Sequence, residues 1–171
     1  ISWFDKMMSV PGASAWISCL SYHRYSGVSD ANLQAIAYRT VQYGIKTGMM
    51  EHIGSGQEDL HKDLKIGCVS SWQQYILAGG GDDANGGKLY VVDQTDPMHP
   101  VVNLGRRSKF LRQYFKFIRR GAVRIEATST VPAVDPLAFV NTNGRFVVVA
   151  KASAAETFSI GGLPPGHYGI K

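Results

Sequence analysis

The sequence has only two cysteines among its 171 residues, and it has no run of about 18 apolar residues. A helix needs a run of about that length to cross a bilayer, so the sequence predicts no transmembrane helix. It shows no secretory signal peptide either. Cys19 and Cys68 each lie in an apolar, strand-like run. We expect both to be buried free thiols rather than a disulfide, and two cysteines do not identify the redox compartment.

Several ligand-binding patterns are also missing. No set of His and Cys residues has the spacing of a zinc site, and no glycine-rich loop leads into Lys-Ser or Lys-Thr, as phosphate binding requires. The run DDANGG (residues 82–87) lacks the alternating oxygen ligands and the closing glutamate of an EF-hand. We therefore expect no metal and no cofactor. Internal repeats and low-complexity segments are absent as well.

What the sequence does contain is the composition of a globular protein, 44% hydrophobic and 18% charged, with a net charge of +5. This is enough apolar material to fill a core, and the mild basic excess permits binding to polyanions without requiring it. Ile1–Met8 looks like the inside of a helix, and residues 164–171 look like a turn and the start of a strand. We therefore expect the chain to be a segment of a longer protein.

Strand-like and helix-like patterns alternate over residues 1–121. The pattern predicts strands over 15–25, 45–52 and 68–77, a loop over 78–87 and a short strand over 88–93; it predicts helices over 29–44, 58–67 and 106–121. Ser29 or Asp30 can cap the first of these helices, and Gly44 can end it. In the last, Phe110, Leu111, Tyr114, Phe117 and Ile118 form an apolar stripe. Such alternation predicts parallel strands joined by right-handed crossovers, and a barrel of this kind builds its site at the C-terminal ends of the strands.

The pattern changes after Gly121. Apolar and polar residues alternate with period two over 122–129, 136–152 and 156–170, and Thr142, Asn143 and Gly144 form a tight hairpin turn. The predicted fold is therefore α/β: the C-terminal half of a (β/α)8 TIM barrel over residues 1–121, followed by a partial antiparallel β-sandwich domain over residues 122–171.

Five segments carry a family resemblance. They are YHRY (22–25), MMEH (49–52), SSWQQY (70–75), LYVVD (89–93) and QYFKFIRRGAVRIEATS (113–129). In this order they resemble the ends of barrel strands six, seven and eight, the approach to the last barrel helix, and the hinge into the β-sandwich of glycoside hydrolase family 30. The chain departs from the family pattern at Phe115, where serine is usual, at Arg120, where proline is usual, and at Arg24, where an aromatic residue is common.

The resemblance implies hydrolysis of a β-glycosidic bond with retention of configuration. Such an enzyme uses two carboxyl groups about 5–5.5 Å apart, one as nucleophile and one as acid and base. Glu51 takes the place of the nucleophile, and it is the only glutamate of the barrel-like part that ends a predicted strand. Tyr25 could donate a hydrogen bond that orients it. His23, Tyr75 and, more weakly, Trp72 are the expected sugar contacts, since aromatic faces stack on sugar rings.

Other interpretations of these residues stay open. Glu51 could be an exposed loop acid, His23 and Tyr25 could be hydrogen-bonded core residues, and Trp72 could be a barrel-wall aromatic. Asp82 and Asp83 are expected to be solvated loop charges. The family's acid/base glutamate follows an asparagine, and no Asn-Glu pair occurs in this sequence. We therefore expect the N-terminal half of the same enzyme to be a necessary partner, and the chain alone to be inactive.

Two other classes of function stay open. The chain could be a non-catalytic carbohydrate-binding or structural fragment. It could also bind nucleic acid through a basic segment interleaved with aromatic residues: Arg106, Arg107, Lys109, Arg112, Lys116, Arg119, Arg120 and Arg124. The aromatic residues of that segment lie on the apolar stripe, so we expect core packing and no nucleic-acid or membrane partner. A polysaccharide substrate would make the protein extracellular.

Overall fold

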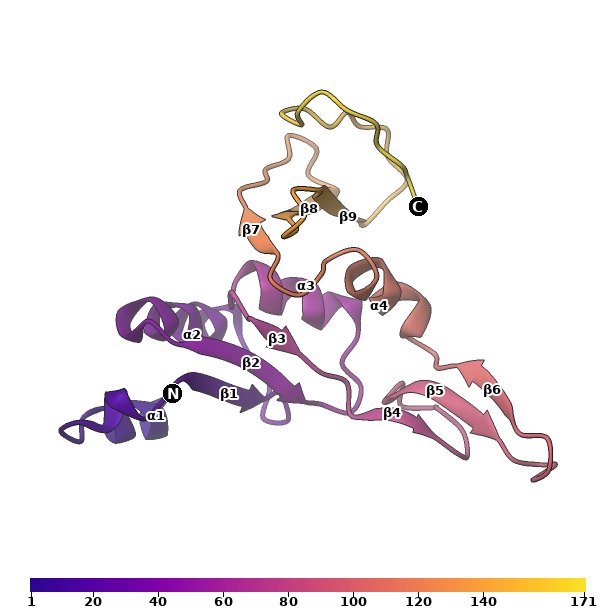
Figure 1. Ribbon diagram of the computed structural model, residues 1–171, viewed down its shortest axis with the longest axis horizontal. Helices are drawn as coiled ribbons and strands as arrows, with labels where there is room; N and C mark the ends of the chain where they lie inside the picture. Colours follow the sequence, from indigo (N-terminus) through magenta and orange to yellow (C-terminus); the bar gives the residue numbers. More distant parts are fainter. The chain divides into compact units, whose positions relative to one another are not determined.

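The computed structural model describes residues 1–171, which form two compact units, Ile1–Phe110 (unit 1) and Leu111–Lys171 (unit 2). The fold is mixed α/β, with four α-helices and three small sheets of three strands each (Figure 1). All three tryptophans and both cysteines lie in unit 1. None of the helices combines the length and apolarity that a membrane span requires.

Unit 1 contains α1 (Ser2–Met8), the short 3-10 helix η1 (Ala13–Ala15), α2 (Asp30–Tyr43) and α3 (Gln57–Lys65). The predicted ends of α2 are confirmed. The Ser29 hydroxyl accepts a hydrogen bond from the Asn32 amide at 3.1 Å, and Gly44 has the left-handed φ of 63° that ends many helices.

The first sheet contains β1 (Cys19–His23), β2 (Lys46–Glu51) and β3 (Ser71–Trp72), in that order and all parallel, as predicted. Helices α2 and α3 lie on one of its faces (Figure 1). The core cluster of unit 1 joins α1, β1 and α2 and contains Phe4, Met8, Leu20, Leu33 and Ile36.

The predicted burial of the two cysteines is wrong, because both are exposed. Side chains alternate between the two faces of a strand, and Cys19 faces away from its buried neighbour Leu20. Cys68 lies in the irregular segment between α3 and β3, with a left-handed φ of 51°. An apolar run in the sequence therefore did not indicate burial at either position.

The predicted strand over 68–77 is also wrong as one element, because it is divided into β3 and β4 (Ile76–Gly79). Gln74 lies at the break. Its side-chain amide donates to the Ser55 and Gly86 carbonyls at 2.7 and 3.1 Å, and its carbonyl accepts from the Tyr75 amide at 2.9 Å. The Tyr75 amide thus bonds to a side chain and not to a neighbouring strand, and the other two bonds tie Gln74 to the segments around Ser55 and Gly86 at the point where β3 ends.

In the second sheet, β4 pairs in parallel with β5 (Lys88–Asp93), which pairs antiparallel with β6 (Val101–Leu104). The strand β5 was predicted and β6 was not. Every residue of β6 is exposed, so the strand lacks the alternation of buried and exposed residues by which strands are recognised in a sequence.

Helix α4 (Ser108–Phe115) is shorter than the predicted helix over 106–121. Leu111 and Tyr114 are buried, but Phe110, predicted for the same apolar stripe, is 45% exposed. The backbone turns after Phe115, with the Phe117 and Ile118 amides both bonded to the Tyr114 carbonyl. The stripe therefore ends with the helix.

Unit 2 contains one antiparallel sheet of β7 (Val123–Ile125), β8 (Val134–Val140) and β9 (Phe146–Ala152). The predicted hairpin turn is confirmed: the Gly144 amide bonds to the Asn141 carbonyl, and Gly144 has a φ of 75°. Residues 153–171 form no strand after β9 ends at Ala152, contrary to the prediction over 156–170. A β-sandwich needs two packed sheets, and unit 2 contains one.

Candidate functional site

The carboxyl ends of β1 and β2 carry the candidate site. The two strands are parallel, and His23 of β1 pairs with Glu51 of β2 after a one-residue shift in register between Tyr22 and His23. Parallel strands bring their carboxyl ends to the same edge of a sheet, so the residues that follow β1 meet those that end β2.

The Tyr25 hydroxyl donates a hydrogen bond to Oε1 of Glu51 at 3.0 Å and accepts one from the Ile53 amide at 3.3 Å. Desolvation is the largest influence on the pKa of Tyr25 and raises it; the hydrogen bond and charge of Glu51 raise it too, against the opposing effect of the Ile53 amide. The tyrosine is thus a neutral donor to the carboxylate at ordinary pH. Its side chain is 50% exposed, so molecules in solution can reach the pair.

Two histidines flank Tyr25. The rings of His23 and His52 make edge-to-face contacts with the Tyr25 ring, with centroids 6.0 and 5.1 Å apart. Nδ1 of His52 lies 2.8 Å from the hydroxyl of buried Ser55, which fixes the ring. His52 was missed by the sequence analysis. Its position directly after Glu51 was the only available signal, and a residue just past a strand end has no predictable face.

A buried polar network lies on the helix side of the same strand ends. Arg24 is 7% exposed; its Nη1 donates to Oδ1 of Asp63 at 2.5 Å, and its Nη2 lies 2.9 Å from Oδ1 of Asp59. Both acids belong to α3, one turn apart. The departure of Arg24 from the family pattern is therefore matched by two carboxylates on the neighbouring helix.

Asp63 also joins β1 and β3 to α3. It accepts hydrogen bonds from the Tyr22 hydroxyl at 2.7 Å and from the Trp72 indole at 2.9 Å. Burial, and to a smaller degree the charge of Asp59, raises the pKa of Asp63; the hydrogen bonds from Tyr22 and Trp72 and the charge of Arg24 oppose that rise. Burial also raises the pKa of Tyr22, helped by the charge of Asp63. This network fixes β1 and β3 against α3 next to the strand ends that carry the candidate site.

The sequence predicted three sugar contacts, and the structure does not place all of them beside the Tyr25–Glu51 pair. The Trp72 indole is half-buried and its N–H is bonded to Asp63, so it belongs to the supporting network. Tyr75 is exposed, and its backbone amide donates to the Gln74 side chain at 2.9 Å. The structure thus brings Glu51, Tyr25, His23 and His52 together, and it places Trp72 in the network around Asp63. No hydrogen bond or ring contact joins Tyr75 to these residues.

Asp82 and Asp83, in the loop after β4, accept hydrogen bonds from backbone amides of that loop, of the start of β5 and of the segment after β6. Asp83 accepts from the Lys88 and Arg106 amides at 3.0 and 2.6 Å, and Asp82 accepts from the Ala84 amide at 3.3 Å. No group of three or more His, Cys, Asp or Glu residues is arranged to hold a metal ion.

No protein-family model matches the sequence, and no curated protein matches it. Solved structures do match the fold. The catalytic domain of GH30 xylanase C from Talaromyces cellulolyticus is similar with a TM-score of 0.66 at 17% sequence identity, over 86% of this chain and 35% of that one. SrfJ from Salmonella typhimurium is similar with a TM-score of 0.66 at 19% identity, over 87% of this chain and 37% of that one.

The chain therefore spans little more than a third of the length of these two structures. At such low identity, the likeness shows the fold alone. The chain has a fold like that of GH30 glycoside hydrolase domains.

Proposed function

We propose that this chain carries the nucleophile of a retaining glycoside hydrolase, with Glu51 as the attacking carboxylate and Tyr25 as the residue that orients it. The observation that carries the proposal is the hydrogen bond of 3.0 Å between Tyr25 and Glu51 at the carboxyl ends of neighbouring parallel strands. The GH30-like fold supports it, since barrel enzymes build their sites at those ends.

In the proposed reaction, an oxygen of Glu51 attacks the anomeric carbon while the glycosidic bond breaks and the leaving oxygen takes a proton. Water then attacks the glycosyl-enzyme ester and releases Glu51. Tyr25 holds Oε1, so the other carboxylate oxygen is the one presented to the sugar. The hydrogen bond also stabilises the carboxylate when it is regenerated.

The proton donor must be a second carboxyl group about 5–5.5 Å from Glu51. Asp59 and Asp63 are bound to Arg24, so neither is suited to this role. We propose that the donor belongs to residues that complete the barrel, as the N-terminal half of the same enzyme would. Without it, a substrate with an ordinary sugar leaving group should not be turned over.

We place a β-linked sugar against the exposed side of the pair. Tyr75 offers a flat ring, His23 offers a hydrogen-bonding edge, and Trp72 offers at most one ring face because its N–H is bonded. No cofactor is required by this chemistry. An oligo- or polysaccharide substrate would place the protein outside the cell.

The test is covalent labelling with a dinitrophenyl β-glycoside in which fluorine replaces the hydroxyl beside the anomeric carbon. The dinitrophenolate leaves without a proton, so labelling needs the nucleophile but not the absent acid. Peptide mapping by mass spectrometry should find the sugar on Glu51. Glu51→Gln should abolish labelling, and Glu58→Gln, an exposed glutamate of α3, should leave it unchanged.

Labelling at another residue would contradict the assignment of Glu51. Sugar binding without any covalent label would instead favour a non-catalytic carbohydrate-binding fragment, because such a fragment needs no nucleophile.

A further inference from the structure

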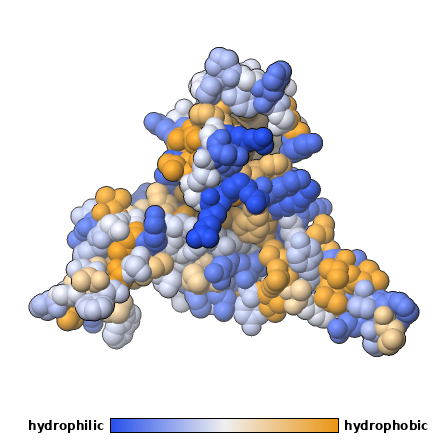
Figure 2. All heavy atoms as spheres, in the orientation of Figure 1, coloured by the Kyte–Doolittle hydropathy of each residue, from blue (hydrophilic) through white to orange (hydrophobic).

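The net positive charge of the protein comes from unit 2. Residues 1–110 contain ten Lys and Arg residues and ten Asp and Glu residues, whereas residues 111–171 contain eight basic residues and three acidic ones. The whole net charge of +5 therefore belongs to the smaller unit. Figure 2 shows strongly hydrophilic residues gathered on the visible face of unit 2.

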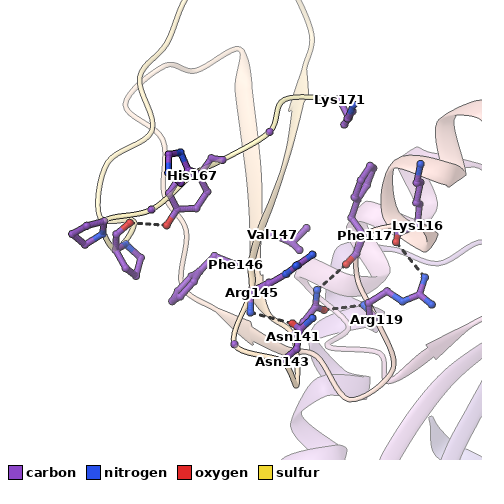
Figure 3. Close-up of a pocket in the computed structure, with 16 residues that line it drawn as sticks. Lys116, Phe117, Arg119, Asn141, Asn143, Arg145, Phe146, Val147, His167 and Lys171 are labelled. Carbon is purple, nitrogen blue, oxygen red and sulfur yellow. Dashed lines mark hydrogen bonds between the residues drawn. The ribbon is translucent and has the colours of Figure 1, made fainter.

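A cavity of about 870 Å³ lies within unit 2 (Figure 3). Its lining has cationic or ionisable groups on Lys116, Arg119, Arg145, His167 and Lys171, and it includes no aspartate or glutamate. Its volume is in the range of small-molecule sites, which is about 300–1,000 Å³. A pocket that gathers cations without a compensating acid attracts anions.

One buried amide holds two walls of the pocket in place. The Asn141 side chain accepts from the Arg119 amide and donates to the Phe117 carbonyl, both at 2.9 Å, and its backbone amide bonds to the Arg145 carbonyl at 2.9 Å. These bonds join the segment after α4 to the hairpin between β8 and β9 (Figure 3). Both arginines are therefore positioned by their backbones.

The two guanidinium groups keep donors available. Arg119 makes one side-chain hydrogen bond, from Nη1 to the Lys116 carbonyl at 3.3 Å, and the Arg145 side chain makes none within the chain. A guanidinium offers five N–H donors in a planar fork that matches a carboxylate or sulfate group.

Aromatic rings line the same cavity. They belong to Phe117, Phe146 and Tyr168. The Tyr168 hydroxyl donates to the Pro164 carbonyl at 2.7 Å and closes a turn in the last segment of the chain. Aromatic faces pack against the C–H surfaces of sugar rings. The pocket therefore combines cations that can bind an anionic group with aromatic faces that can pack against a sugar ring.

We propose that this pocket binds an anionic glycan, with its carboxylate or sulfate held by Arg119 and Arg145 and its ring against Phe146 or Tyr168. The choice of a sugar rests on the proposed function, but the site contains no residue of the Glu51 site. A single concave pocket suits one or two sugar rings, whereas a nucleic acid would engage Arg112 and Arg120 outside it as well.

The test is calorimetric titration of the chain with four probes: an oligogalacturonate, a sulfated galactose oligosaccharide, a neutral xylo-oligosaccharide and single-stranded DNA. At least one acidic sugar should bind about tenfold or more tightly than the neutral sugar, since charge-assisted hydrogen bonds are the stronger ones. Comparison of the two acidic sugars identifies the anionic group.

A matched pair of double variants separates a specific site from general charge. Arg119→Gln with Arg145→Gln should weaken binding of the acidic sugar about tenfold or more. Arg112→Gln with Arg120→Gln removes the same charge from exposed positions outside the pocket and should change it less than about twofold. The backbone bonds of Arg119 and Arg145 survive in the first variant, and circular dichroism checks its fold.

Equal losses in both variants, equal binding of acidic and neutral sugars, or a preference for DNA would overturn the proposal. Glu51→Gln should not affect this binding. If Glu51 is labelled but the acidic sugar does not bind, the pocket proposal is wrong and the proposed catalysis stands. If the acidic sugar binds but Glu51 is not labelled, the proposed catalysis is wrong and the pocket proposal stands.

Discussion

Tyr25 is bonded at both sides of its hydroxyl, to the Glu51 carboxylate and to the Ile53 amide. Tyr25→Phe removes the donor and keeps the ring contacts. A hydrogen bond to a charged group contributes about 1.5 kcal/mol or more, so we expect labelling of Glu51 by the activated fluoroglycoside to slow about tenfold or more. Tyr38→Phe, on an exposed residue of α2, is the control. Equal labelling rates in the unchanged protein, Tyr25→Phe and Tyr38→Phe would contradict the orienting role of Tyr25.

Tyr22 predicts a particular pH dependence of stability. Burial, then the charge and hydrogen bond of Asp63, raises its pKa above the ordinary value of about 10. The stability due to its neutral form is therefore full below pH about 10 and is lost as pH rises further, because only the unfolded state releases the proton. In Tyr22→Phe, the unfolding free energy should fall less steeply above that pH, by about 1.4 kcal/mol per pH unit. Urea unfolding at several alkaline pH values measures this slope, and equal slopes would contradict the prediction.

Arg24 is a buried charge with two carboxylate partners. Arg24→Met leaves Asp63 buried without its cation, so we expect a loss of about 3–5 kcal/mol in the free energy of unfolding. Lys62→Met breaks the exposed pair of Lys62 and Asp30 and should cost less than about 1 kcal/mol. Similar urea midpoints for the two variants would show that the Arg24 network contributes little to stability.

The sequence indicated part of the candidate site and not all of it. The pairing of Tyr25 with Glu51 was predicted, because both positions lay at the ends of predicted parallel strands; in the structure Tyr25 lies two residues beyond the end of β1. Arg24 was noted only as a departure from the family, since its partners lie on α3, distant in sequence. The role of Trp72 as a donor to Asp63 depends on the same tertiary contact. Side chains that meet through packing leave no local pattern to find.

At the scale of the elements, α2 depends on its N-cap. Ser29→Ala removes the acceptor for the Asn32 amide and should cost about 1 kcal/mol of unfolding free energy. Ser26→Ala, in the exposed loop before the cap, makes the same chemical change without a capping bond and should be nearly neutral. Thermal unfolding followed by circular dichroism compares them, and equal melting temperatures would show that the cap is dispensable.

Element prediction succeeded where local chemistry decided the outcome, as at the ends of α2 and at the Gly144 turn. It failed where side chains competed with the backbone or where burial gave no pattern. Gln74 interrupts an apolar run by bonding to Ser55 and Gly86, which no periodicity reveals. The exposed strand β6 exists because β5 offers it a hydrogen-bonding edge. Such elements are set by their neighbours rather than by their own residues.

At the scale of the whole molecule, unit 1 exposes apolar surface beside an unpaired strand edge. The strand β1 pairs only with β2, and a cavity of about 710 Å³ beside it is lined by Trp3 and Trp16, which are 78% and 90% exposed. Exposed patches and open edges of this kind promote association.

We therefore expect sedimentation to show self-association of the chain that increases with concentration. Trp3→Glu with Trp16→Glu should reduce it without loss of stability, because neither side chain is buried. Val41→Glu, an 84% exposed position of α2 outside that cavity, adds charge elsewhere in unit 1 and should have a smaller effect. Equal behaviour of these variants would show that the edge of β1 is not the contact.

The confinement of all three indole rings to unit 1 has a practical consequence. Tryptophan fluorescence excited at the red edge of the protein absorption band originates in unit 1 only, so it does not report on unit 2. Far-ultraviolet dichroism registers both. Denaturation curves recorded with the two optical methods will coincide if the units melt together and will separate if they melt one after the other.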